Sequence, residues 1–212
     1  MLTEPQRRRY AEEGYLHLPG RFSSKTLTRL SDELRTICRF GYGPVDGVAT
    51  PSPKETDEDL LRKAVAVHFP HKLSPPIREM IRHPVLVAVF TALLGPNVKC
   101  VQSMFFIRPS GGPGQAWHQD EHYVPSRDRS TTGAWIAIDP ATPASGCLWV
   151  IPGSHRRGIL WPHRAHNDRR FDPVGMAGSF PYTEADAVPL PVSPGDLIVF
   201  NERCRRYPLN TI

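Results

Sequence analysis

Hydrophobic and polar residues follow two different periods along the chain. Apolar residues recur at helical spacing in residues 24–41 and again in residues 84–94, where a proline opens the segment. From residue 98 onward, short apolar or β-branched runs of strand length are separated by turns rich in Gly, Pro, Ser and Asp. Helices followed by a series of strands predict an α+β, mainly β fold, which we assign to a single domain over residues 1–212.

Local signals give the boundaries of several elements. Thr3 and Gln6 form a capping-box pattern, and Gly14 is placed to end the short helix that begins there. Residues 41–59 are acidic and turn-forming without periodicity, so they predict a long flexible loop. The predicted strands are the runs 98–107, 116–123, 133–138, 147–151, 187–192 and 196–200.

Composition narrows the functional class. The chain is 40% hydrophobic and 22% charged, as globular proteins are, and its net charge of +5 comes mostly from arginine. Arginine suits carboxylates and phosphates, so we expect an anionic small-molecule partner, whereas no basic block is long enough to predict nucleic-acid binding. Four widely spaced cysteines, no secretory signal and no bilayer-length apolar run predict a cytoplasmic protein without disulfides or a membrane partner. Nothing in the pattern indicates an oligomeric state.

The stretch WHQDEHY, residues 117–123, carries the strongest chemical signal. His118, Asp120 and His122 stand at every second position, so they share one face if the segment is extended. An imidazole and a carboxylate supply two-thirds of the two-His-one-carboxylate set that binds non-haem Fe(II) and leaves coordination positions open. A lone H-x-D is common in strands for structural reasons, and by itself it does not establish a metal site.

The surroundings of this motif are more specific. The segments WHQDEHY, GAWIAI, SGCLWV and PGSHRRG, together with LLGPNVKCVQSMFFIRP upstream, resemble the phytanoyl-CoA dioxygenase family of Fe(II)/2-oxoglutarate-dependent oxygenases over about residues 10–200. The resemblance implies a double-stranded β-helix, or jelly-roll barrel, with N-terminal helices packed on one side. It also implies a dioxygenase that hydroxylates a small molecule with Fe(II), 2-oxoglutarate and O2, and with ascorbate as an accessory reductant.

Carried over residue by residue, the resemblance assigns roles around the metal. His118 and Asp120 would bind the iron and be catalytic. Gln119, Met104 on the preceding strand and Trp135 on the following strand would contact 2-oxoglutarate. Methionine and tryptophan side chains can supply the apolar walls that the methylene chain of this cosubstrate needs.

The resemblance also bears on the residues that follow the motif. His122 shares the predicted face, but the histidine at that position of the family does not bind the metal. With Tyr123 and Arg127 in the loop beyond it, His122 is therefore expected to line the substrate pocket.

The sequence departs from the family after the segment GDLIVF, residues 195–200. The family's third iron ligand is a histidine whose position falls on Arg205 or Arg206, and the family's arginine for the far carboxylate of 2-oxoglutarate has no counterpart in this sequence. A guanidinium would repel a dication, or bind an anion in an empty site. Glu202 or Cys204 could replace the missing ligand, since carboxylate and thiolate both bind iron.

Three interpretations of this departure stay open. The C-terminal end is shortened or altered relative to the family, leaving the barrel's last strands incomplete; or the chain has lost catalysis; or its site is rearranged. The first is favoured because the 2-oxoglutarate contacts are retained. The leading function is an Fe(II)/2-oxoglutarate-dependent dioxygenase. The alternatives are a non-catalytic small-molecule-binding protein that keeps the barrel, and a cupin-like enzyme that uses another metal.

Overall fold

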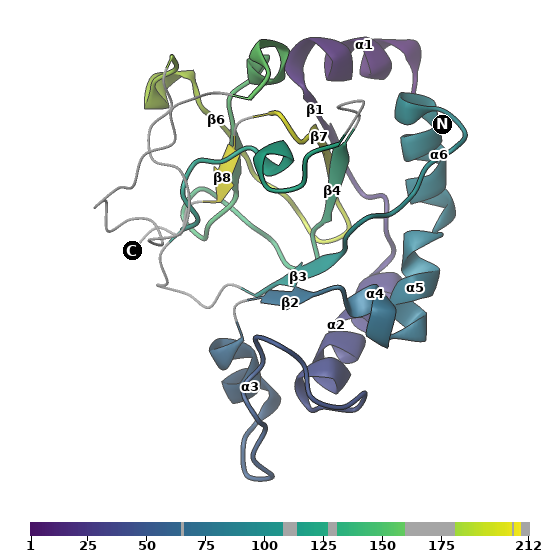
Figure 1. Cartoon of the computed structure of the whole chain (residues 1–212), viewed down its shortest axis with the longest axis vertical. Helices are drawn as coiled ribbons and strands as arrows, with labels where there is room; N and C mark the ends of the chain where they lie inside the picture. The colour runs from purple at the N-terminus through teal and green to yellow at the C-terminus, as the bar shows by residue number, and fades with distance from the viewer. Residues whose placement is uncertain (65, 108–113, 127–130, 160–180, 205, 209–212) are drawn as a thin grey trace. The chain divides into compact units, whose positions relative to one another are not determined.

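The computed structural model of the chain divides into two compact units (Figure 1). It describes every residue except 65, 108–113, 127–130, 160–180, 205 and 209–212. The first unit comprises residue 1 and residues 23–109, and the second comprises residues 2–22 and 110–212. The H-x-D motif therefore belongs entirely to the second unit.

The first unit combines helices with a short antiparallel sheet. Leu27, Leu30 and Ile37 form the buried side of its longest described helix, as the helical spacing predicts. In the sheet, Val67 of β2 pairs with Phe105 of β3. The elements are α2 (Ser24–Cys38), α3 (Asp57–Lys63), β2 (Ala66–His68), α4 (Pro70–Leu73), α5 (Pro75–Ile81), α6 (Pro84–Leu94) and β3 (Met104–Phe106).

The predicted loop over residues 41–59 ends earlier than expected. Helix α3 begins at Asp57 because Thr56 and Asp59 form a capping box: the Thr56 hydroxyl accepts the Asp59 N–H, and the Asp59 carboxylate accepts the Thr56 N–H. A capping box satisfies two backbone donors that would otherwise lack partners at a helix start. Leu60 then enters the buried apolar cluster of this unit, which ties the end of the loop to the core.

The second unit is built on two antiparallel sheets. One has the strand order β1-β7-β4 and the other β6-β5-β8. Helix α1 precedes them, with the predicted capping box at Thr3 and Gln6 and a left-handed Gly14 at its end. The elements are α1 (Glu4–Glu13), β1 (Tyr15–Leu18), η1 (Asp120–His122), β4 (Thr132–Ile136), β5 (Leu148–Val150), η2 (Ser154–Arg157), η3 (Glu184–Asp186), β6 (Val188–Leu190), β7 (Leu197–Asn201) and β8 (Arg206–Pro208).

One apolar core joins the two sheets of this unit. Ile198, the second residue of β7, is fully buried and lies opposite Trp135 of β4, which packs partly buried on the same cluster. Leu148 and Val150 of β5 enter the cluster from the other sheet. Every side chain of β7 from Leu197 to Phe200 is buried, because this strand is covered by β1 and β4 on its two edges and by the core.

The predicted fold class is confirmed at the level of helices followed by antiparallel sheets. The strand predicted over residues 116–123 is wrong. Only His118 makes a ladder contact, an isolated bridge, and Asp120–His122 then turn into the 3-10 helix η1 because Tyr123 and Val124 donate their N–H groups to the Asp120 carbonyl. Within the residues that the structure describes, the strands form separate sheets and not a closed barrel.

The chain's apolar segments are short and its thiols are unpaired. All four cysteines are free, and Cys38, Cys147 and Cys204 are buried. None of the helices in the described part of the chain combines the length and the apolar character needed to cross a bilayer.

Two glycines with positive φ test how tightly the start of β7 is packed. Gly195 has a φ of 91°, and a Cβ there would collide with the Phe22 carbonyl oxygen, whereas Gly20 has a φ of 59° and open space around it. We expect Gly195→Ala to lower the free energy of unfolding by roughly 2–4 kcal/mol and Gly20→Ala by only about 1 kcal/mol. Urea denaturation measures both, and equal losses would contradict the packing argument.

Candidate functional site

The H-x-D segment is fixed against the last described strand by its backbone. His118 donates its N–H to the Arg206 carbonyl at 3.1 Å, and Arg206 donates its own to the His118 carbonyl at 3.2 Å. On its other side Arg206 pairs with Val150 of β5. The backbone at position 206 therefore lies between β5 and the motif, and its side chain meets the side chain of Asp120.

His118 and Asp120 face each other, with the His118 side chain buried and the Asp120 side chain 30% exposed. The Nδ1 of His118 lies 2.8 Å from the Ala116 carbonyl oxygen, and since a carbonyl only accepts, Nδ1 carries the hydrogen. This leaves Nε2 directed at Asp120 Oδ1, 3.2 Å away. Two ligands that each lie about 2.1 Å from one metal ion, at a right angle to each other, are about 3 Å apart. The pair is thus suited to be two neighbouring ligands of one cation.

Arg206 holds the other oxygen of the same carboxylate. Its Nη2 donates to Asp120 Oδ2, and its guanidinium carbon lies 3.8 Å from the centre of the Phe200 ring. The Arg206 residue is only 6% exposed. Burial would raise the pKa of Asp120, but the Arg206 guanidinium and His118 outweigh it and hold that pKa well below its usual range. Asp120 is therefore an ionised carboxylate whose charge is balanced by the neighbouring Arg206 guanidinium.

Further charged side chains of both signs lie close to this pair. Arg203 forms an ion pair with the buried Glu121, whose N–H also donates to the Glu202 carbonyl at 3.3 Å. Burial, followed by the negative charge of Asp120, raises the pKa of Glu202 to about 7, and Arg206 offsets part of that rise. The turn between β7 and β8 thus brings the Glu202 carboxyl and the Arg203 guanidinium to the motif, and β8 brings the Arg206 guanidinium. The motif itself contributes the carboxyl groups of Asp120 and Glu121.

Neither proposed substitute completes a set of three metal ligands. The buried Cys204 thiol donates to the Ile151 carbonyl at 3.6 Å and accepts from the Ser154 hydroxyl at 3.8 Å, and burial raises its pKa to about 11. Among the described residues, no three His, Cys, Asp or Glu side chains come together as a metal site. His118 and Asp120 fit a divalent ion, but Arg206, at one of the two positions expected for the third ligand, presents a cation, so the described residues do not complete the three-ligand iron set.

Gln119 anchors the motif to its neighbours. Its side chain is fully buried, and its amide nitrogen donates to the Gly158 carbonyl at 2.9 Å and to the Arg203 carbonyl. These two bonds join the H-x-D segment to the loop after η2 and to the β7–β8 turn. The expected contact of Gln119 with 2-oxoglutarate stays a prediction.

The other predicted site residues are distributed over both units. Trp135 lies on β4 in the second unit, where it packs on the core, and Met104 lies on β3 in the first unit. Their contacts with 2-oxoglutarate stay predictions. The His122 ring packs edge-on against Tyr123, with centroids 4.9 Å apart, and Tyr123 is more than half exposed, which suits a residue at the edge of a pocket. Arg127 lies outside the described residues.

Three charged residues of the site were not predicted from the motif. Glu121 and Arg203 form a buried ion pair, and Glu202 carries the raised pKa, although Glu202 was considered as a ligand. The signal for them is charge spacing: two adjacent acids in the motif face E-R-x-R-R after β7. Such a pattern becomes informative only once the two segments are known to lie side by side.

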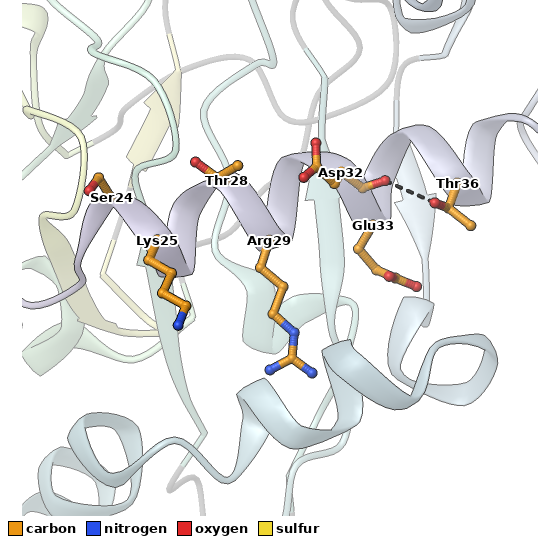
Figure 2. A pocket seen from close by; sticks show the side chains of 7 residues that line it. All are labelled: Ser24, Lys25, Thr28, Arg29, Asp32, Glu33 and Thr36. Atoms are coloured by element: carbon orange, nitrogen blue, oxygen red, sulfur yellow. Dashed lines mark hydrogen bonds between the residues drawn. The ribbon is translucent and has the colours of Figure 1, made fainter.

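The first unit carries a shallow polar groove along α2, which Figure 2 shows from close by. Its side chains come mostly from one face of the helix, and the Thr36 hydroxyl donates to the Asp32 carbonyl at 3.0 Å. Arg29, which lines the groove, already pairs with Glu79 of α5 at 2.6 Å. The groove is open and all its lining residues belong to one helix, so we read it as ordinary solvated surface.

Comparisons with known proteins point to one family. The model of a family described as phytanoyl-CoA dioxygenase matches residues 10–204. The rice protein "Phytanoyl-CoA dioxygenase 1" is 26% identical over 230 residues, which cover 94% of this chain and 80% of the rice protein. A "Probable alpha-ketoglutarate-dependent hypophosphite dioxygenase" of Stutzerimonas stutzeri is 23% identical over 159 residues, which cover 75% of this chain and 55% of the S. stutzeri protein.

Solved structures agree with the sequence comparison. The crystal structure of EctD from S. alaskensis with 2-oxoglutarate and 5-hydroxyectoine matches at a TM-score of 0.75 and 20% identity, covering 100% of this chain and 71% of that one. At this identity the likeness concerns the fold. The chain spans about half the length of several curated relatives that it matches. The resemblance drawn from the motifs is confirmed at the level of the family.

Glu202 predicts a pH dependence of stability. Its pKa is about 7 in the folded chain against an ordinary value of 4.5, so the folded state holds this proton more tightly than the unfolded state does. The contribution of Glu202 to stability is then fully present below pH 4.5 and is lost as the pH rises through 7. We expect Glu202→Gln to unfold at higher temperature than the parent at pH 8, by the equivalent of about 1–3 kcal/mol, and to lose this advantage at pH 4.5.

Thermal unfolding by circular dichroism at both pH values checks this prediction. The exposed Glu12 offers a matched control, and Glu12→Gln should shift the unfolding temperature little at either pH. A stability gain for Glu202→Gln of the same size at pH 4.5 and pH 8 would argue against a buried, titrating carboxyl.

Proposed function

Because this chain belongs to the phytanoyl-CoA dioxygenase family, we propose that it is an Fe(II)/2-oxoglutarate-dependent oxygenase of a small organic molecule, built on a jelly-roll fold. The observation that supports this most is the His118–Asp120 pair. A buried imidazole nitrogen and a carboxylate oxygen converge at 3.2 Å, while Nδ1 of the same ring is engaged by the Ala116 carbonyl. A metal-binding histidine characteristically donates its other ring N–H in this way, which fixes the ring's tautomer and direction.

The chain's own residues would prepare the site as follows. His118 and Asp120 would hold the metal, which together with 2-oxoglutarate and O2 supplies the oxidising chemistry when bound. Gln119 keeps the two ligands in register through its two bonds to backbone carbonyls. Trp135 would offer an apolar wall to the cosubstrate chain, and His122 and Tyr123 would meet the substrate.

The substrate is proposed to be an anion. Most basic residues of this chain are arginines, whose planar guanidinium suits carboxylates and oxoanions. The relative named for hypophosphite supports this choice, because that substrate is itself a small oxoanion.

A second candidate is a non-catalytic member of the family that binds a small molecule without a metal. The observation in its favour is the guanidinium of Arg206, which pairs with Asp120 at one of the two positions expected for the third ligand. A cation at this place weakens the attraction of the site for a divalent ion while leaving the fold intact.

Metal and cosubstrate binding separate these functions. Anaerobic titration with Fe(II) and then with 2-oxoglutarate should produce the visible charge-transfer band of a chelated oxoacid if the oxygenase proposal holds. A folded chain that takes up neither ligand supports the binding protein. A preference for Zn(II) or Mn(II), without 2-oxoglutarate uptake, points to the cupin-like alternative.

Asp120→Ala should abolish Fe(II) uptake, because it removes the only carboxylate that faces His118 among the described contacts. The loss should be at least about 100-fold in affinity, since even residues that only support a ligand cost 10–100-fold when removed. The exposed Asp139, in the same unit, is the control, and Asp139→Ala should bind metal like the parent. Unchanged metal content in Asp120→Ala would refute the assignment of the ligand pair.

Trp135→Ala should weaken 2-oxoglutarate binding by about tenfold while changing metal affinity less than about twofold, because it removes an apolar wall and not a ligand. Isothermal titration of each ligand in turn provides the measurement. Val87, half exposed on α6 in the first unit, supplies the control, and Val87→Ala should leave both affinities near those of the parent. Equal losses of metal and cosubstrate in Trp135→Ala would indicate damage to the fold.

A further inference from the structure

Arg206 is held in its place more firmly than a surface arginine would be. Its backbone pairs with His118 on one side and with Val150 on the other, and its guanidinium lies over the Phe200 ring. The residue is 6% exposed, and the Nη1 atom is buried without a hydrogen-bond partner. The side chain therefore has little freedom to move into solvent while β8 stays paired.

Arg206 engages the same carboxylate that a metal ion would need, through its other oxygen. Asp120 shares its two oxygens between His118, 3.2 Å from Oδ1, and Arg206, bonded to Oδ2. A divalent ion bound by His118 and Asp120 would lie beside the guanidinium, with little water between them to screen the repulsion. The metal ion and the guanidinium are both positive and would repel each other strongly where little water lies between them. The charge of the guanidinium is already balanced by the Asp120 carboxylate.

We propose that Arg206 is an internal cation that takes the place of the third metal ligand, neutralises Asp120 and weakens the binding of divalent metal at the His118–Asp120 pair as long as its contact with Asp120 persists. The inference rests on the proposed function only in that both concern the His118–Asp120 pair. According to this inference, the two remaining ligands can still bind a metal ion, but the charge of Arg206 lowers the affinity of the site for that ion.

Three substitutions at one position test the inference. Arg206→Gln removes the charge, Arg206→Met removes the charge and keeps an apolar side chain against Phe200, and Arg206→His adds a third ligand at a backbone position already paired with His118. The probe is Co(II) under anaerobic conditions, read from its visible absorption and by calorimetry. Arg156, exposed in η2, gives the control for net charge, and Arg156→Gln should bind Co(II) like the parent.

We expect the parent chain to bind Co(II) weakly, Arg206→Gln and Arg206→Met to bind it at least about tenfold more tightly, and Arg206→His at least about 100-fold more tightly. Circular dichroism establishes that each variant is folded. If Arg206→His does not fold, the Gln and Met variants still decide the question, since the inference requires that loss of the charge alone raises affinity. Equal Co(II) affinities in the parent and in every folded variant would overturn it.

The same samples separate this inference from the proposed function. Tight Co(II) and Fe(II) binding by Arg206→His without any uptake of 2-oxoglutarate would support the inference and refute the oxygenase. Tight Fe(II) binding by the unaltered chain, followed by the charge-transfer band with 2-oxoglutarate, would support the oxygenase and overturn the inference.

Discussion

The backbone pairing of residue 206 with residues 118 and 150 is the constraint on which the site depends. It places one strand between β5 and the H-x-D segment, so whatever side chain occupies position 206 must face Asp120. The pairing is made by backbone groups and is indifferent to the side chain. The identity of a single residue therefore decides whether the site presents a third ligand or a positive charge, while the surrounding sheets and core stay the same.

The charges around this constraint nearly cancel one another. Asp120 pairs with Arg206, and Glu121 pairs with Arg203, both in surroundings from which most water is excluded. Burial and the negative charge of Asp120 raise the pKa of the nearby Glu202, and Arg206 offsets part of that rise. Because Asp120 and Glu121 already have cationic partners, a divalent ion at Asp120 would compete with Arg206 for the carboxylate.

Sequence predicted the local features of the fold well and the long-range ones less well. The capping box of α1, the buried side of α2 and the strands β4, β5 and β7 follow from periodicity and turn chemistry. The strand predicted through His118 was wrong because alternation of residues cannot show that only one of them finds a partner strand. Likewise the family register indicated position 205 or 206 for the third ligand, but that Arg206 would pair with Asp120 depends on side-chain directions 86 residues apart.

Retention of H-x-D does not by itself argue for catalysis, because two parts of this motif also serve the fold. The His118 backbone carries the bridge to β8, and the Gln119 amide joins two loops, so both would be kept for stability in a metal-free protein. The orientation of His118 Nε2 toward Asp120 Oδ1 is different. With a neutral ring that carries its hydrogen on Nδ1, it brings two hydrogen-bond acceptors together, an arrangement that a cation between them would stabilise. The relative positions of these two side chains therefore support a metal site more strongly than the presence of the motif does.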